Sequence, residues 1–363
     1  MALRCGIVGL PNVGKSTIFN ALTAAGIAAE NYPFCTIEPN VGVAVVPDPR
    51  LDVLAEIVRP DRVVPTTVEF VDIAGLVGGA SEGEGLGNRF LAHIREVDAV
   101  AHVVRCFEDP NVTHVAGTVD PAADIATIDT ELALADLGTV ERALERTRRQ
   151  ARAGVEGAAA RLEVLERLEA ALSAGSPVRS LELTSAEETV VAELFLLTAK
   201  PVLYVANVAE GAGPDDPLVE PVRKIAQAEG ADLVVVSGEL EAQLAAFDAE
   251  DRAELLAEYG LEEPGLHRVV RAAYRLLGLL TFFTTGPEEV RAWTVRRGAT
   301  APEAAGRIHT DFEKGFIRAE VVAYEDFVAH GGEQGAKEAG KWRLEGRDYV
   351  VAEGDVIRFR FNV

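Results

Sequence analysis

The chain has 363 residues, of which 48% are hydrophobic and 26% charged, which is typical of a globular protein long enough for more than one domain. No apolar run approaches the roughly 18 residues that cross a bilayer. The first residues, MALRCGIVGLPNVGKS, also lack a basic leader with a long apolar stretch, so we expect a cytoplasmic protein without membrane contact. A net charge of −23 opposes binding to DNA, and three widely spaced cysteines (Cys5, Cys35 and Cys106) predict free thiols.

Short apolar runs rich in Val predict the buried strands of a mostly parallel sheet, because each is bounded by Gly, Pro or Asp. In the first 120 residues these runs cover residues 5–8, 41–46, 68–71 and 99–104. The same pattern resumes at residues 202–206 and 233–236. Strands that alternate with helix-compatible stretches in this way indicate an α/β domain.

Residues 9–17, GLPNVGKST, have the pattern of a phosphate-binding loop, and they follow a predicted strand and open a predicted helix, as that loop requires. Gly9 and Gly14 allow successive backbone N–H groups to converge on an anion, and the helix N-terminus adds partial positive charge. We expect Lys15 to reach the β- and γ-phosphates and Ser16 to bind magnesium.

Two further segments have the spacing of nucleotide-sensing switches. In DIAG, at the end of an apolar strand, the Asp72 carboxylate is expected to hold magnesium, usually through a water, and the Gly75 N–H to sense the γ-phosphate. Thr36 lies between this strand and the phosphate loop, where a GTPase usually has a magnesium-binding Thr. Thr36 is therefore the candidate for a further metal ligand.

The residues expected to control hydrolysis depart from the common GTPase pattern. Leu76 follows Gly75, where many GTPases have a Gln that orients the attacking water, so we expect slow hydrolysis. His114, beyond the strand at residues 99–104, is the candidate to orient water instead. The alternative is that His114 is structural, as most single histidines are.

Between residues 122 and 198 the composition changes to Ala, Leu, Glu and Arg, which predicts helices. Two leucine stripes with helical spacing flank a Gly-containing turn near residues 154–157, so we predict two antiparallel helices that pack together as a projecting coiled-coil-like arm. The stripes are Leu134, Leu137 and Leu144, then Leu165, Leu168 and Leu172. Arginines near the end of the first helix fit a solvated face paired with glutamates or a patch that contacts RNA phosphate. These are Arg142, Arg146, Arg148, Arg149 and Arg152.

The expected base-recognition motif favours adenine over guanine. GTPases commonly have N-K-x-D after a late strand, and its Asp accepts two hydrogen bonds from guanine. This chain has Asn207, Val208 and Glu210 in NVAE, and the longer Glu side chain is expected to disturb that geometry. The Asn207 amide can instead pair with the N6/N7 edge of adenine. Ser237, with the glycine that follows it, is a candidate to close over the base.

After residue 260 the pattern predicts a small α+β domain dominated by strands. A helix is expected at residues 266–277, two strands joined by a Gly-Pro turn at residues 281–285 and 290–295, and a last strand at residues 356–361.

These motifs together resemble the YchF / Obg-like ATPase family, in the translation-factor branch of the P-loop GTPases, over the whole chain. The segments that carry the resemblance are residues 9–17, NYPFCTIEPN (31–40), DIAGLVGGASEGEGLGNRFL (72–91), HVVRCFED (102–109), NVAE (207–210) and the C-terminal domain. The resemblance implies an α/β P-loop NTPase fold, a Ras-like G domain at residues 1–121 and 199–279. It also implies a helical coiled-coil insertion at residues 122–198 and a ubiquitin-like TGS domain at residues 280–363.

The resemblance further implies which residues form the site. Six residues of the phosphate loop would wrap the phosphates, namely Asn12, Val13, Gly14, Lys15, Ser16 and Thr17. Ser16 and Thr36 would bind Mg²⁺, and Asn207, Val208 and Glu210 would form the base site. The family often has Ser-Ala where this chain has Ser237 and Gly238.

The implied function is an ATPase with slow turnover that associates with the ribosome. We favour a nucleotide-gated switch over an enzyme whose purpose is turnover, because Leu76 opposes fast hydrolysis. The alternative is a guanine-specific ribosome-associated GTPase, which would follow if Glu210 still reads guanine. The expected partner is the ribosome, at its large subunit and rRNA. A monomer is expected, although an exposed arm also fits a partner site.

Overall fold

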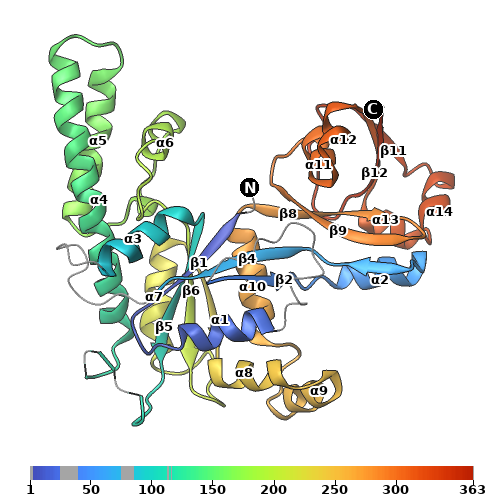
Figure 1. The fold of residues 1–363 in the computed structure, drawn as a ribbon, viewed down its shortest axis with the longest axis horizontal. Coiled ribbons are helices and arrows are strands. Elements are labelled where there is room, and N and C mark those ends of the chain that lie inside the picture. Colours follow the sequence, from blue (N-terminus) through green and yellow to red (C-terminus); the bar gives the residue numbers. More distant parts are fainter. Residues whose placement is uncertain (1–2, 25–39, 75–85, 113, 116, 363) are drawn as a thin grey trace. The chain divides into compact units, whose positions relative to one another are not determined.

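The computed structural model describes residues 3–24, 40–74, 86–112, 114–115 and 117–362, with the chain drawn in Figure 1. It divides into two compact units: Met1–Gly42 with Glu69–Ala272, and Val43–Val68 with Ala273–Val363. The chain passes to the second unit within one strand and returns within another. Among the described residues, no helix is both long enough and apolar enough to span a membrane.

The first unit is built on a six-stranded sheet with the order β2-β4-β1-β5-β6-β7. Its strands are β1 (Arg4–Val8), β2 (Val41–Val45), β4 (Thr67–Asp72), β5 (Ala99–Cys106), β6 (Val202–Val208) and β7 (Asp232–Val236). β1 pairs in parallel with β4 and β5, and β6 pairs in parallel with β5 and β7. All residues of β5 and β6 are buried, which explains their continuous apolar runs. The strands predicted for this sheet are confirmed to within about two residues.

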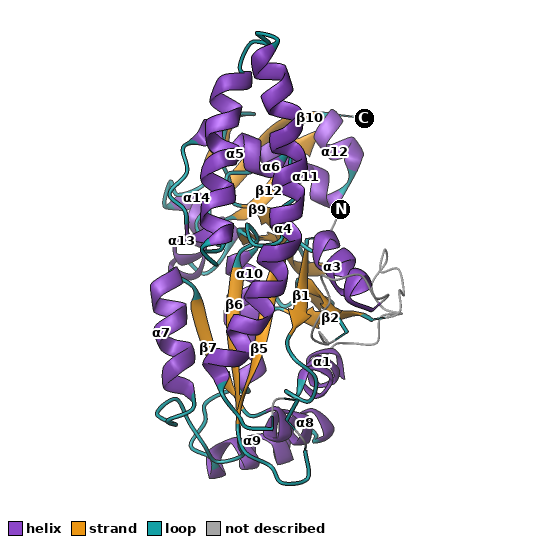
Figure 2. Cartoon of the chain, turned by 90° about the vertical axis from the view of Figure 1, so that its left-hand side faces the viewer, coloured by secondary structure: helices purple, strands orange, loops and turns teal. Residues whose placement is uncertain are grey.

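Helices cover this sheet and connect its strands. They are α1 (Lys15–Ala24), α3 (Leu86–Glu96), α4 (Pro121–Arg152), α5 (Ala158–Ser173), a 3₁₀ turn (Val178–Ser180), α6 (Ser185–Ala192), α7 (Val219–Glu229), α8 (Gly238–Ala246), α9 (Ala249–Glu258) and α10 (Gly265–Leu276). α4 packs on β5 and α7, and α7 packs on β6 and β7 (Figure 2). α1 packs against β1 and α8. Parallel strands with helical crossovers form the predicted α/β fold.

The arm consists of α4 and α5, and α5 packs beside the part of α4 that extends away from the sheet (Figure 1). Asp120 caps α4 by accepting a hydrogen bond from the Ala123 N–H at 3.1 Å, and Pro121 opens the first turn. The core between the helices contains Leu144, Leu165, Leu168 and Leu172, as the leucine stripes predicted. Leu134 is a wrong prediction, because its side chain is 49% exposed. The small Ala133 takes the inward position beside it.

The second unit contains a separate six-stranded sheet with the order β11-β10-β12-β8-β9-β3. Its strands are β3 (Arg62–Val64), β8 (Leu279–Thr285), β9 (Glu289–Arg296), β10 (Phe316–Val322), β11 (Arg343–Glu345) and β12 (Val356–Phe361). Its helices are α2 (Pro49–Val58), α11 (Ala301–Ile308), α12 (Thr310–Lys314), α13 (Tyr324–Ala329) and α14 (Glu333–Glu338). β8 and β9 form an antiparallel pair, as do β10 and β12. The predicted α+β character of this region is confirmed.

A segment from early in the chain belongs to this second unit, which the sequence patterns did not indicate. β3 pairs in parallel with β9 over Arg62–Val64. On α2, Leu51 and Leu54 are buried in a core that includes Phe283 and Val290. The boundaries of the G domain, the arm and the TGS domain stay predictions. In the structure, Val43–Val68 packs with the C-terminal residues.

Candidate functional site

The phosphate loop joins β1 to α1 and has the backbone conformation that its glycines permit. Gly14 has φ +92°, in the region that favours glycine, and a Cβ at this position would lie 2.2 Å from the Asn207 Nδ2 atom. Asn12 has φ +62°, a left-handed conformation that asparagine tolerates better than most residues. Any side chain at position 14 would therefore displace Asn207 from the loop.

Lys15 is the charged group at the centre of the loop, and its side chain is 7% exposed. Its Nζ donates a hydrogen bond to the Leu10 carbonyl at 2.7 Å. Burial lowers the pKa of Lys15 to about 8, and the attraction of the Asp72 carboxylate opposes that change. A phosphate would supply the negative charge that favours the protonated lysine.

Asp72 ends β4 opposite Lys15 and has an unsatisfied atom. Its Oδ1 is buried without a hydrogen-bond partner. Burial raises the pKa of Asp72, although Lys15 and a hydrogen bond with Ser16 lower it. Within the described ranges, no group of three or more His, Cys, Asp or Glu could hold a metal. An oxygen pair such as Asp72 and Ser16 fits Mg²⁺, which binds through few protein ligands plus waters and phosphates.

Asn207 and Arg105 lie next to each other at the carboxyl ends of β6 and β5, where their backbones are paired in register. Asn207 Nδ2 donates to the Val13 carbonyl at 2.9 Å, and its Oδ1 accepts from the Gly238 N–H at 2.8 Å. Arg105 Nη1 donates to the Asn12 carbonyl at 3.3 Å. Arg105 was not among the predicted site residues, although a charged residue near the end of a Val-rich, buried strand is a recognisable signal.

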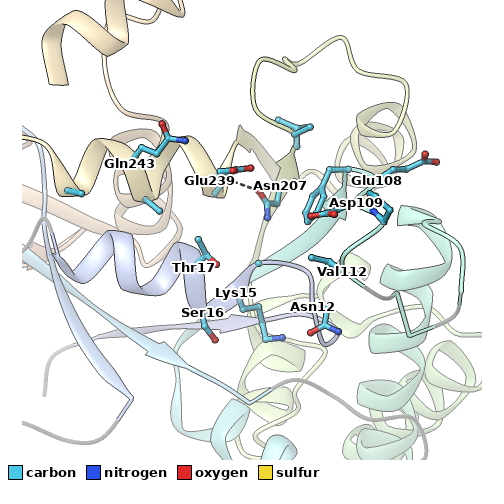
Figure 3. A pocket seen from close by; sticks show the side chains of 18 residues that line it. Asn12, Lys15, Ser16, Thr17, Glu108, Asp109, Val112, Asn207, Glu239 and Gln243 are labelled. Atoms are coloured by element: carbon cyan, nitrogen blue, oxygen red, sulfur yellow. Dashed lines mark hydrogen bonds between the residues drawn. The ribbon is translucent and has the colours of Figure 1, made fainter. Parts of the chain in front are cut away.

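A cavity of about 910 Å³ opens at the phosphate loop (Figure 3). Its volume is within the range of small-molecule and cofactor sites. Figure 3 shows the segment after β5 on one side of the loop and α8 on the other. The lining includes Asn12, Gly14, Lys15, Ser16, Thr17, Phe107, Glu108, Asp109, Pro110, Val112, Asn207, Val208, Glu239 and Gln243. The structure therefore brings together most of the predicted phosphate-loop residues and two of the predicted base-site residues.

The other residues predicted near the base have partners of their own. Glu210 is exposed and accepts hydrogen bonds from the Tyr259 hydroxyl and, at 3.5 Å, from Gln243 Nε2. Ser237 caps α8, where its hydroxyl accepts from the Leu240 N–H. Each polar atom of Asn207 has one partner, which leaves one N–H and one lone pair of its amide for a base.

His114 is buried and does not belong to the described lining of the cavity. Its Nε2 is 3.0 Å from Asp124 Oδ2, in the first turn of α4. Burial raises the pKa of Asp124, and the hydrogen bond with His114 opposes the rise. To orient a water molecule at the phosphates, His114 would have to break its contact with Asp124.

Several predicted residues lie outside the described residues: Thr36, Gly75, Leu76 and Cys35. The predicted roles of Thr36 as metal ligand, Gly75 as γ-phosphate sensor and Leu76 as the residue that slows hydrolysis stay predictions, as does the free thiol of Cys35. Cys5 and Cys106 are buried free thiols, as expected.

Two family models match the chain. Residues 4–135 match a family described as "50S ribosome-binding GTPase". Residues 279–362 match the YchF-GTPase_C family, whose description is "Protein of unknown function (DUF933)". The first match contains the phosphate loop, and the second lies within the second unit.

Curated relatives match from end to end. The "Ribosome-binding ATPase YchF" of Haemophilus ducreyi is 60% identical over 363 residues, covering all of both chains. The protein of the same name from Bacillus subtilis is 55% identical over 366 residues, again covering all of both chains.

Solved structures agree in fold. The YchF GTPase of Schizosaccharomyces pombe has a TM-score of 0.88 at 37% identity, covering 99% of this chain and 97% of that chain. A GTP-binding protein from Pyrococcus horikoshii has a TM-score of 0.60 at 19% identity, covering 99% of this chain and 100% of its own, and supports the fold alone.

Proposed function

Because the chain belongs to the YchF family, we propose that it is a Mg²⁺-dependent ATPase with slow turnover that acts as a nucleotide-gated switch on the ribosome. The observation that carries the proposal is the cavity at the phosphate loop, where Lys15, Ser16 and Asn207 share one opening. Relatives named as ribosome-binding ATPases support the same activity for this chain.

The phosphate loop would hold the nucleotide. The first N–H groups of a helix have no acceptor within that helix, so the N-terminus of α1 would offer donors to phosphate, and Lys15 adds a positive charge beside them. Asn12, Val13, Gly14 and Thr17 complete the cradle in the proposed site. Lys15, within reach of the β- and γ-phosphates, would stabilise the charge that develops as the terminal phosphate leaves.

We propose that Ser16, Asp72 and Thr36 hold Mg²⁺. The buried, unpartnered Asp72 Oδ1 supports this assignment, because a carboxylate oxygen kept from water and from donors requires a cation or a proton. Held by Ser16, Asp72 and Thr36, the metal would supply positive charge to the phosphates. The chain's own contribution is to orient two oxygen donors beside Lys15.

Hydrolysis would be slow because Leu76 cannot orient water, and His114 is the proposed group that takes this role. His114 would leave Asp124 and move toward the phosphates, while the Gly75 N–H contacts the γ-phosphate. We expect His114→Ala to bind ATP with unchanged affinity and to lose most turnover. Unchanged turnover in this variant would remove His114 from the mechanism.

The base site would prefer adenine. The Glu210 carboxylate accepts hydrogen bonds from Tyr259 and Gln243. Because its oxygens have these partners, we propose that Glu210 does not bind the guanine edge. Val208 lines the cavity where common guanine sites have a Lys stem. Asn207 and Ser237 would position the wall that contacts the base.

The proposed partner is the ribosome, at its large subunit and rRNA, in the cytoplasm. The name of the family matched by residues 4–135 supports the subunit. On the arm, Arg148 and Arg149 are exposed and pair with Glu166 and Glu145 at 3.4 and 3.8 Å. Such exposed pairs contribute little to stability, so phosphate could replace the glutamates. We propose that the chain binds as a monomer.

The first test is titration of nucleotide-free protein with ATP and GTP, with and without Mg²⁺, followed by sedimentation with ribosomes in each nucleotide state. We expect ATP to bind at least about tenfold more tightly than GTP, a difference of ~1.4 kcal/mol. Tighter binding of GTP by that margin would favour the guanine-specific GTPase. Ribosome binding that is identical with ATP, with ADP and without nucleotide would contradict the switch.

A further inference from the structure

Arg105 is a buried, charged residue beside the cavity at the phosphate loop, and it has no part in the proposed mechanism. It is the seventh residue of β5, a strand whose residues are all buried, and its side chain is 1% exposed. Its backbone pairs in register with that of Asn207. Arg105 therefore lies at the carboxyl ends of the parallel strands, which face the phosphate loop.

The guanidinium donates to three backbone carbonyls. Nη1 reaches Asn12 at 3.3 Å, Nε reaches Phe107 at 3.1 Å, and Nη2 reaches Val112 at 3.0 Å. Arg105 also lies over the Phe107 ring, with 4.6 Å from Cζ to the ring centroid.

The hydrogen-bond acceptors are neutral carbonyls, and the Asp124 carboxylate attracts the guanidinium electrostatically. Together they return only part of the desolvation cost of a buried guanidinium. An apolar residue of similar volume is often as stable in such a place. Stability alone therefore does not explain an arginine here.

The bond to Asn12 controls where a neighbouring N–H points. In a planar trans peptide the C=O and the following N–H point in opposite directions. Arg105 holds the Asn12 carbonyl, and Asn207 holds the Val13 carbonyl at 2.9 Å. The N–H groups of Val13 and Gly14 are thereby turned away from the strand ends, toward the side on which an anion would bind.

The other two bonds hold the opposite wall of the cavity. Phe107 and Val112 are the two ends of the segment that lines this wall, and Glu108, Asp109 and Pro110 lie between them. Arg105 bonds to both ends of the segment and to the phosphate loop. A guanidinium can do this because its donors diverge in one rigid plane, whereas an ammonium is a single point on a flexible stem.

We infer that Arg105 is a positioning residue of the nucleotide site: its guanidinium joins the phosphate loop to the Phe107–Val112 wall and orients the loop N–H groups for the phosphates. The inference rests on the proposed function, because it assigns Arg105 to the site that binds the nucleotide. Arg105 itself touches no substrate atom in this role.

The test compares full-length Arg105→Lys and Arg105→Ala with the parent chain by calorimetric titration with ADP. Arg179→Lys is the matched control. Arg179 is also largely buried, with a side chain that is 9% exposed, and it bonds to Asp129 and Glu229 away from the cavity lining. Circular dichroism checks folding of every variant, and Arg105→Lys alone decides the test if Arg105→Ala does not fold.

We expect Arg105→Lys to bind ADP at least about tenfold more weakly than the parent chain, a loss of ~1.4 kcal/mol, whereas Arg179→Lys keeps the parent affinity. Guanidinium chloride, far below denaturing concentration, is expected to restore ADP binding to Arg105→Ala, and urea is not. Parental affinity in Arg105→Lys, an equal loss in Arg179→Lys, or equal rescue by urea would each overturn the inference. A parent chain that binds no nucleotide would instead overturn the proposed function.

Discussion

The nucleotide cavity contains two ionisable groups whose charge depends on burial. Lys15 and Asp72 face each other, and burial disfavours the charged form of each. The charge of each group is only partly compensated: Lys15 donates to a neutral carbonyl, and Asp72 has a hydrogen bond with Ser16 but none at its Oδ1. Phosphate and Mg²⁺ would supply both partners, so ligand binding and ionisation are coupled at this site.

Binding of ADP is expected to take up protons in alkaline solution, because the pKa of Lys15 is lowered to about 8 in the free protein. Phosphate favours the charged lysine, so the pKa of Lys15 rises in the complex. Above about pH 8 the free protein loses this proton and the complex keeps it, so affinity falls as pH rises. Calorimetry at about pH 9 in two buffers of different ionisation enthalpy measures the uptake. A binding enthalpy that does not depend on the buffer would contradict the prediction.

Substitution of Asp72 is expected to remove the effect of Mg²⁺ on nucleotide binding. Asp72→Ala deletes the buried oxygen without a partner, and loss of a group that orients a bound metal typically weakens metal binding by about tenfold or more. ATP titration with and without Mg²⁺ measures the difference. Asp52→Ala, at an exposed position on α2, is the control and keeps the parent response. An unchanged Mg²⁺ dependence in Asp72→Ala would exclude Asp72 from the metal site.

At the scale of single elements, the middle of α4 is fixed by buried polar contacts. Asp136 on this helix accepts hydrogen bonds from the backbone N–H groups of Leu197 and Thr198 at 2.9 and 2.8 Å, and from the Thr198 hydroxyl at 2.7 Å. Thr198 in turn accepts from the Val178 N–H at 3.3 Å. These contacts join the arm to the segment that leads into β6.

Asp136→Ala is expected to lower the free energy of unfolding by about 3 kcal/mol, because it leaves three buried donors without their acceptor. Urea denaturation measures the change. Glu141→Ala, at an exposed position on the same helix, is expected to change stability by less than about 0.5 kcal/mol. Equal stability of the two variants would show that Asp136 does not anchor the arm.

At the scale of the whole molecule, each unit is discontinuous in sequence. The second unit takes α2 and β3 from the Val43–Val68 segment, and its core contains Leu51 and Leu54 beside C-terminal side chains. Burial of one leucine contributes about 1.5–3 kcal/mol, which is a large part of the stability of a small domain.

We therefore expect a fragment of residues 273–363 alone to unfold without a cooperative transition. The same fragment joined to residues 43–68 through a flexible linker is expected to unfold cooperatively, because Leu51, Leu54 and the β3 edge return to the unit. Thermal unfolding followed by circular dichroism compares the two. A cooperative transition in the shorter fragment would mean that the C-terminal residues form a sufficient core.

Local patterns were enough to predict most of the fold and part of the site. Val-rich runs identified the six strands of the first sheet, because burial on both faces excludes most polar residues from a parallel strand. In the second sheet, β8, β9 and β12 were predicted, whereas β3, β10 and β11 were not. The phosphate loop was predictable because its glycines, Lys15 and Ser16 are contiguous and require one backbone conformation. Family motifs led to the same fold.

Contacts between distant segments were not visible in those patterns. Helical spacing placed Leu134 on the packed stripe, but the approach of α5 selects Ala133 and leaves Leu134 exposed. Nothing local assigned α2 to the C-terminal unit. The Asn12 partner of Arg105 and the partners of Asp136 and Glu210 also come from segments far away in the chain. Periodicity records which face of an element is apolar, whereas the partner of a buried charge depends on which strand ends and helices the fold brings to it.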